Sequence, residues 1–354
     1  MFDQKSIATL YYAHRKTLSS LVALESALNG RFYNMQAAIE CMMLAALTGE
    51  AMLMIGPPGT AKSRLVRSFC GLVGLIKDED PATTIRSDGA LQKNEKYFEY
   101  LLTQFTEPSE LFGFYDLGKL FAAEASQRSF ERATDGMMQK AEVVFLDEVF
   151  NASSAILNSL LTFMNERKFH DRGRVHQTPM RLLFSATNHP PREEGLGAAF
   201  DRFLLRCRLD NAAADPTSLA QLLAKAWNET HAAPRADSQG DQFKGLLEAL
   251  DAYRLQVDAM TRAGMKINTD DILFSRLADL VTELRRKDLS QMSNRRLVKF
   301  SGVVLAHALL RAARAGDAAP PRIEPRDLMV ILNYGLDQED ASTVQTLRTH
   351  LLGM

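Results

Sequence analysis

The sequence predicts an α/β fold built on a parallel sheet and followed by an all-helical part. Three observations support this prediction. Short apolar segments alternate with amphipathic helical segments up to about residue 209, a pattern typical of a parallel sheet covered on both faces. After residue 210, Ala- and Leu-rich helical segments follow one another without a strand pattern. The first strand is joined to the next helix by a Gly/Pro turn that ends in Lys62-Ser63.

The length predicts two domains. A chain of 354 residues with 46% hydrophobic and 24% charged residues can build a large core. We expect an α/β core with N-terminal helices at residues 1–211 and an all-helical domain at residues 212–354.

Charge and cysteine content indicate which partners and which cellular compartment to expect. The 42 basic and 43 acidic residues give a net charge of −1, so no overall field attracts nucleic acid or anionic membrane. The three cysteines are odd in number and lack metal-ligand spacing, which predicts buried free thiols in a reducing compartment. The N-terminus has no signal-peptide pattern, and the apolar runs are too short to span a membrane. We therefore expect a soluble cytoplasmic protein.

The first elements are helical. Residues 6–28 carry apolar side chains at helical spacing, and Asn29-Gly30 predicts the end of that helix. A second helix is expected at 35–48, closed by Gly49, followed by a strand at 51–55.

The remaining elements follow from the same patterns. Residues 75–96 are polar and aperiodic, which predicts an exposed loop of unusual length, and 167–178 are polar and turn-forming. Further segments are expected as strands at 97–105, 141–148 and 180–186 and one ending near 209, and as helices at 62–73, 153–166, 216–230, 241–264, 270–287, 293–315, 324–336 and 339–352.

The turn after the first strand has the composition of a P-loop. Gly56 and Gly59 let backbone N–H groups surround a polyphosphate at a helix N-terminus. Lys62 then brings an ammonium to the β- and γ-phosphates, and the Ser63 hydroxyl completes the shell of Mg²⁺. Ala61 occupies the position where the common pattern has its second glycine. Because Ala tolerates positive φ poorly, we expect no left-handed residue there.

Polar residues at the ends of later strands supply the other parts that hydrolysis needs. Asp147 ends a buried strand where Mg²⁺ binds, and Glu148 is placed to accept a proton from water. Asn188 follows the next strand and can bind that water or the γ-phosphate. Arg202 lies beyond it and is a source of positive charge.

A final candidate opens a helix of the second domain. Arg295 and Arg296 follow Ser293, a predicted N-cap. We expect one of the two arginines to reach back to phosphate across the crevice between the domains.

Five ordered motifs together resemble those of MoxR-type AAA+ ATPases, with the RavA-like branch the nearest match. They are Gly-Pro-Pro-Gly-Thr-Ala-Lys-Ser (56–63), Phe-Thr-Glu-Pro-Ser-Glu-Leu-Phe-Gly (105–113), Val-Phe-Leu-Asp-Glu-Val-Phe (144–150), the segment 155–169 and Phe-Ser-Ala-Thr-Asn-His-Pro-Pro (184–191). The resemblance covers roughly residues 30–315. It implies a P-loop NTPase core of the AAA+ class, an all-α lid domain, and a hexameric ring in which ATP lies between subunits.

The resemblance also implies roles for individual residues. Lys62 is the Walker A lysine, Ser63 and Asp147 serve Mg²⁺, Glu148 polarises water, and Asn188 is the first sensor. Ala61 is common in this family. The residues expected to contact ATP are Gly56, Gly59, Thr60, Ala61, Lys62, Ser63 and Arg64.

Arginines complete the implied site. Arg202 matches the arginine finger that reaches a neighbouring subunit, with Arg206 as the alternative. Arg295 aligns with the second sensor, although Arg296 is adjacent. The 167–178 segment corresponds to a hairpin directed toward the ring pore, where its charges face a substrate: Arg167, Lys168, Arg172 and Arg174.

The leading function is ATP-driven, chaperone-like remodelling of a protein partner, and the resemblance suggests a partner with a von Willebrand A domain. One alternative is a nucleic-acid motor of MCM type, which shares the Ala-Lys-Ser loop and the hairpin. The near-zero net charge and the absence of a basic stretch with interleaved aromatics argue against it. A second alternative is an assembly scaffold gated by ATP, which Glu148 argues against.

Overall fold

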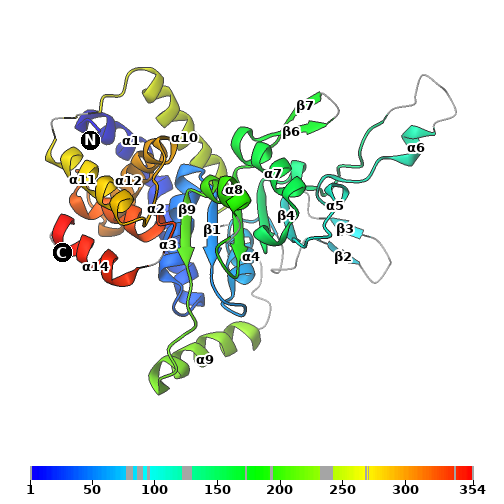
Figure 1. Ribbon diagram of the computed structural model, residues 1–354, viewed down its shortest axis with the longest axis horizontal. Coiled ribbons are helices and arrows are strands. Elements are labelled where there is room, and N and C mark those ends of the chain that lie inside the picture. The colour runs from blue at the N-terminus through cyan, green and yellow to red at the C-terminus, as the bar shows by residue number, and fades with distance from the viewer. Residues whose placement is uncertain are drawn as a thin grey trace.

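The computed structural model describes residues 2–76, 83–85, 91–93, 96–121, 130–171, 174–191, 194–231, 242–267, 269, 271–338 and 340–352. A central parallel sheet separates a helical part from a projecting part (Figure 1). In the described ranges, no helix is long and apolar enough to cross a membrane.

The sheet has five parallel strands in the order β4 (Tyr97–Leu101), β5 (Val143–Asp147), β8 (Leu182–Thr187), β1 (Met52–Ile55) and β9 (Leu205–Arg208). Alternate residues of β1 point to opposite faces: Met52 and Met54 join one buried cluster, and Leu53 and Ile55 join another. Burial on both faces explains the continuous apolar runs in the sequence. The α/β prediction is confirmed.

The strand order determines which residues meet. β1 pairs with β8 on one side and β9 on the other, with Ile55 opposite Thr187 and Arg208. β8 lies between β1 and β5 and pairs with both. The segments that follow β1, β5 and β8 therefore lie together at the carboxyl edge of the sheet, where open α/β sheets bind ligands.

The N-terminal helix differs from the prediction, because two helices replace one. α1 (Gln4–Ala13) ends at His14, and α2 (Arg15–Arg31) continues through Asn29-Gly30. The N–H of Phe32 still donates to the carbonyl of Leu28. A glycine near the end of a helix costs only about 1 kcal/mol, and four buried leucines hold α2 in place.

Further helices cover the sheet and its projecting edge. Gly49, in the left-handed conformation, ends α3 (Gln36–Thr48) as expected. The other helices of this part are α4 (Lys62–Leu72), α5 (Pro108–Phe112), α6 (Leu117–Leu120), α7 (Ser154–Glu166) and α8 (Gly197–Arg202), with short 3₁₀ turns at Met138–Lys140, Val149–Asn151 and Glu194–Leu196.

The described residues of the C-terminal part form helices joined by loops, and no strand is found among them. Its helices are α9 (Pro216–His231), α10 (Leu246–Arg262), α11 (Ile272–Arg286), α12 (Asn294–Ala315), α13 (Met329–Tyr334), preceded by a 3₁₀ turn at Pro325–Leu328, and α14 (Ala341–Leu352). α10 and α12 pack against α2 and α3, so one hydrophobic cluster joins both ends of the chain.

Two hairpins lie outside the main sheet. Residues 75–96, expected as a loop, contain an antiparallel pair of short strands, β2 (Thr83–Ile85) and β3 (Leu91–Lys93); most other residues of that segment are outside the described ranges. The polar 167–178 segment forms β6 (Lys168–Asp171) and β7 (Arg174–Gln177), which stand out from the body (Figure 1).

Candidate functional site

The loop between β1 and α4 has the backbone geometry of a phosphate-binding turn. A Cβ added to Gly56 would lie 2.3 Å from the carbonyl oxygen of Leu209, so only glycine fits there. Gly59 has φ +86°. Ala61 has φ +59°, in the left-handed region, so the expectation that the loop avoids this conformation is wrong. A left-handed Ala costs about 1 kcal/mol, too little to change a loop fixed at both ends.

Lys62 joins the loop to the end of β8. Its Nζ donates to the carbonyl oxygen of Gly56 at 2.7 Å and of Pro57 at 3.0 Å, and lies 3.4 Å from Asn188 Oδ1. Burial lowers the pKa of Lys62, while Asp147 and Glu148 oppose that shift. The ammonium is thus held by neutral oxygens with two carboxylates near it.

Ser63 and Asp147 form an oxygen-donor pair. The Ser63 hydroxyl donates to Asp147 Oδ2 at 3.3 Å, across the gap between α4 and the end of β5. Mg²⁺ prefers one or two protein oxygens together with phosphate and water, so these residues fit the ion. Among the described residues, no cluster of three or more His, Cys, Asp or Glu could hold a metal by itself.

Glu148 is held in an unusual conformation beside this pair. Its φ is +51°, its N–H donates to Asp147 Oδ1 at 3.0 Å, and its carboxylate accepts a bond of 3.4 Å from Asn151 Nδ2. A left-handed Glu is uncommon, and such strain occurs often at functional sites. This left-handed turn directly follows Asp147, the last residue of β5.

A cavity continues from the P-loop toward α9. It is lined by Gly59, Thr60, Ala61 and Arg64 of the loop and α4, and by residues 31–35 and 209–212. Lys225 of α9 donates to the carbonyl oxygens of Asn29 and Phe32. Sequence reasoning missed residues 31–35 and 209–212 because they carry no motif. The packing of α2 against α4 and the pairing of β1 with β9 bring them there.

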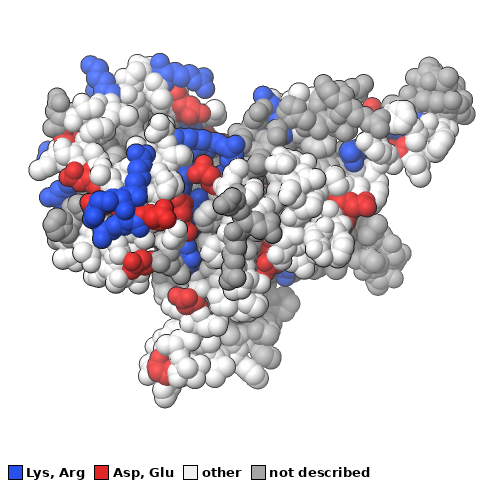
Figure 2. Space-filling model, in the orientation of Figure 1, with Lys and Arg blue, Asp and Glu red and all other residues white. Residues whose placement is uncertain are grey.

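Arg202 and Arg295 line a second, separate cavity. Lys299, Arg167 and Arg181 share it with the backbone of residues 48–51, and no P-loop residue lines it. The Nε of Arg202 is buried and has no hydrogen-bond partner within the described structure. Figure 2 shows Lys and Arg side chains gathered over α11 and α12, with Asp and Glu side chains next to them. Arg295 therefore does not share this cavity with the P-loop of its own chain, and its expected reach to phosphate stays a prediction.

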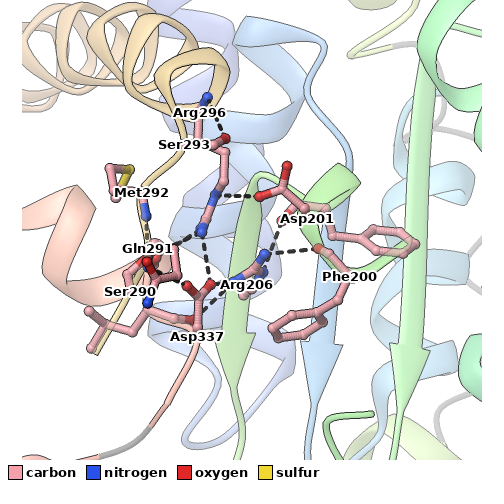
Figure 3. Close-up of polar contacts among 12 residues, drawn as sticks. Phe200, Asp201, Arg206, Ser290, Gln291, Met292, Ser293, Arg296 and Asp337 are labelled. Carbon is pink, nitrogen blue, oxygen red and sulfur yellow. Dashed lines mark hydrogen bonds and ion pairs between the residues drawn. The ribbon is translucent and has the colours of Figure 1, made fainter. Parts of the chain in front are cut away.

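The other two candidate arginines are buried. The side chains of Arg206 and Arg296 are 1% and 2% exposed, and both bind Asp337 (Figure 3). Arg206 is therefore not available as a finger, nor Arg296 as a sensor. The N-cap prediction is confirmed, since Ser293 Oγ accepts from the Arg296 N–H at 3.4 Å. It places Arg295 on the exposed side of the first turn of α12.

The hairpin charges divide in the structure. Arg167 does not extend along the hairpin, because its guanidinium donates to the carbonyl oxygens of Gly49 and Arg181. Lys168 begins β6 and is partly exposed. Arg172 and the side chain of Arg174 lie outside the described part of the chain.

The parallel sheet, the P-loop and the acidic pair at the end of β5 define a P-loop nucleotide-binding fold of the AAA+ class with a helical C-terminal part. A family model described as the MoxR domain of MoxR-vWA-beta-propeller ternary systems matches residues 19–78 and 82–247. The chain belongs to this MoxR family.

Curated relatives match about half of the chain. Uncharacterized protein MJ0812 of Methanocaldococcus jannaschii is 36% identical over 186 residues, which are 52% of this chain and 43% of that protein. Uncharacterized protein MJ0079 of the same organism is 34% identical over 53% of this chain and 43% of its own length. Structural protein ORF618 of Acidianus two-tailed virus is 29% identical over 52% of this chain and 26% of that protein. The match thus spans less than half the length of each relative.

A solved structure shares the fold along the chain. It is the crystal structure of a "putative ATPase" from Cytophaga hutchinsonii, which is 15% identical, has a TM-score of 0.61, and is matched over 97% of this chain and 96% of that one. At this identity the likeness concerns the fold alone.

Proposed function

We propose that this chain hydrolyses ATP with Mg²⁺ as part of a homo-oligomeric ring, in which each site is completed by a neighbouring subunit. The contact set Lys62, Ser63, Asp147 and Asn188, drawn together from three strand ends, carries the proposal. ATP supplies the phosphates and Mg²⁺ neutralises their charge when both are bound.

Each residue of the set has a separate task. Backbone N–H groups at Gly59, Thr60 and Ala61 surround the phosphates, and Lys62 exchanges its loop carbonyls for phosphate oxygens. Ser63 and Asp147 hold Mg²⁺. Glu148 accepts a proton from the attacking water, which Asn188 orients. The cavity lined by Arg64 and by residues 31–35 and 209–212 receives the nucleoside.

The second cavity supports completion by a neighbour. Arg202 and Arg295 line a space that no P-loop residue of the same chain lines, and the Arg202 Nε is buried without a hydrogen bond inside the described structure. A buried guanidinium N–H that lacks an acceptor is stabilised when it donates a hydrogen bond to a phosphate oxygen. We assign Arg202 as the finger and Arg295 as the second sensor, both acting on ATP held by the adjacent subunit.

The proposed partner, ring size, branch and domain division are based on membership in the MoxR family. Membership in a group named for MoxR-vWA systems supports remodelling of a protein partner that carries a von Willebrand A domain. A hexamer, the RavA-like branch and a domain division into residues 1–211 and 212–354 belong to the same proposal.

The test is ATP turnover by the Glu148→Gln variant. Loss of the base should abolish turnover while the affinity for fluorescent ATP stays within about twofold of the parent, because Glu148 acts on water rather than on the nucleotide. Glu131→Gln, an exposed acid paired with Lys119, is the matched control and should retain full turnover. Unchanged turnover in Glu148→Gln would rule out this base.

A further inference from the structure

Asp337 joins two arginines that come from different parts of the chain. It lies in the connection between α13 and α14 and binds Arg206 of β9 and, at 2.8 Å, Arg296 of α12 (Figure 3). We propose that Asp337 is a positioning residue that fixes α8, which bears Arg202, against the first turn of α12, which bears Arg295. The two arginines are thereby presented to the neighbouring subunit as one unit, so this inference rests on the proposed function.

The Arg206 side of the junction holds α8. Its Nη2 donates to the carbonyl oxygen of Phe200 at 2.9 Å and its Nε to that of Phe203 at 3.0 Å. Its guanidinium also covers the Phe200 ring at 3.7 Å. A cation that binds the last carbonyl groups of a helix stabilises the position of that end. Arg202 is the last residue of α8, so its backbone lies between the two carbonyl groups that Arg206 binds.

The Arg296 side holds the start of α12. One terminal nitrogen donates to Ser290 Oγ at 3.1 Å, and the other to the carbonyl oxygen of Gly335 at 2.8 Å. Its Nε lies 3.8 Å from Asp201 Oδ1. Arg296 directly follows Arg295, and Asp201 directly precedes Arg202. The contact therefore joins the immediate neighbours of Arg202 and Arg295.

Asp337 is the charge that makes this junction possible. Two buried guanidinium groups repel each other, and burial together with Arg296 lowers the pKa of Arg206 to about 10. The Asp337 carboxylate lies between them, and its other oxygen accepts the N–H of Gln291 at 2.9 Å. Although burial opposes its ionisation, Arg206 and Arg296 lower the pKa of Asp337. Its removal would leave two like charges facing each other.

The direct test measures the distance between α8 and α12. The native cysteines are buried, so spin labels can be placed at Ala198→Cys on α8 and Val298→Cys on α12, two exposed positions. We expect a narrow distance distribution that broadens or shifts when Asp337→Asn is added. Asp327→Asn is the matched control, because Asp327 is a buried carboxylate bound to Arg311 within the helical part and should leave the distribution unchanged. An unaltered distribution in Asp337→Asn would overturn the proposal.

Turnover gives a second readout that simple destabilisation would not reproduce. At a temperature where the Asp337→Asn variant is folded, its kcat should fall about tenfold or more, since small misplacements of catalytic groups have effects of this size. Its affinity for ATP should be unchanged. Mixing it with Glu148→Gln subunits should restore turnover, because those subunits contribute intact arginines. Mixing it with Arg202→Ala subunits should not. The decisive comparison mixes each variant with Glu148→Gln subunits. If Arg202→Ala regains turnover in such a mixture and Asp337→Asn does not, the inference is overturned and the proposed function stands.

If Arg202→Ala itself keeps full turnover, the proposed function fails instead. The label distances then still decide whether Asp337 positions the two helices. The two failures are therefore distinguishable.

Discussion

Lys62 Nζ lies 3.4 Å from Asn188 Oδ1, although the two residues are 126 positions apart in the sequence. The contact exists because β8 pairs with β1, so the residue after β8 lies beside the P-loop. It links Lys62, which we propose binds phosphate, to Asn188, which we propose senses it.

Lys62→Ala should weaken ATP binding. A charge-assisted hydrogen bond to phosphate contributes about 1.5–3 kcal/mol, so we expect affinity to fall about tenfold to a hundredfold. Titration with a fluorescent ATP analogue measures this change. Lys168→Ala, on the hairpin away from the loop, should bind normally; equal affinity in Lys62→Ala and the parent would remove Lys62 from the site.

Asn188→Ala should separate binding from hydrolysis. The side chain contacts Lys62 only weakly, so we expect ATP affinity within about threefold of the parent, whereas kcat should fall about a hundredfold because the attacking water is no longer oriented. Steady-state turnover and equilibrium binding test this split. A variant that loses affinity but keeps kcat would assign Asn188 to ground-state binding instead.

Substitutions at the two small residues of the loop, Gly56 and Ala61, should differ in their effect on stability. Gly56→Ala places a Cβ 2.3 Å from Leu209 O, so we expect a loss of stability of more than about 2 kcal/mol. Ala61→Gly removes left-handed strain but adds freedom to the unfolded chain, so its stability should stay within about 1 kcal/mol of the parent. Denaturant unfolding compares them. A large loss in Ala61→Gly would show that the Ala methyl group is itself needed.

The helical part should lose stability in acid through Asp327. Burial opposes its ionisation, but bonds from His307 and Arg311 lower its pKa below the ordinary value of 3.8. A lowered carboxyl pKa stabilises the fold above the unfolded-state pKa, and that contribution is lost as pH falls through the folded-state pKa. We expect the free energy of unfolding to fall below about pH 4, and Asp327→Asn to flatten this dependence. The control Glu131→Gln should leave this pH dependence unchanged. If Asp327→Asn loses stability in acid as steeply as the parent, Asp327 is not the group responsible.

The sequence predicted the strands, helices and P-loop better than the contacts between distant residues. The strand ends, the P-loop and Asp147-Glu148 follow from local patterns, because strand apolarity and loop chemistry are local properties. Ala61 was misjudged because a penalty of about 1 kcal/mol is small beside the packing that fixes the loop.

The arginines show what local patterns leave open. The sequence around Arg202, Arg206, Arg295 and Arg296 does not show which of them are buried. Tertiary packing separates Arg202 and Arg295, which line a cavity, from Arg206 and Arg296, which bind Asp337. Asp337 itself has no sequence signal. The region that lines the nucleoside cavity at residues 31–35 was likewise unmarked, because it meets the P-loop only through the packing of α2 against α4.

The most direct measurement of the central claim is ATP turnover in mixtures of Arg202→Ala and Glu148→Gln subunits. Each variant alone should be inactive: one lacks the finger and the other the base. In a mixed ring, Glu148→Gln subunits donate intact arginines to sites with an intact Glu148, so an equal mixture should recover about a quarter of parental turnover by random pairing. Mixed assemblies that form but show no recovery would contradict an active site shared between subunits.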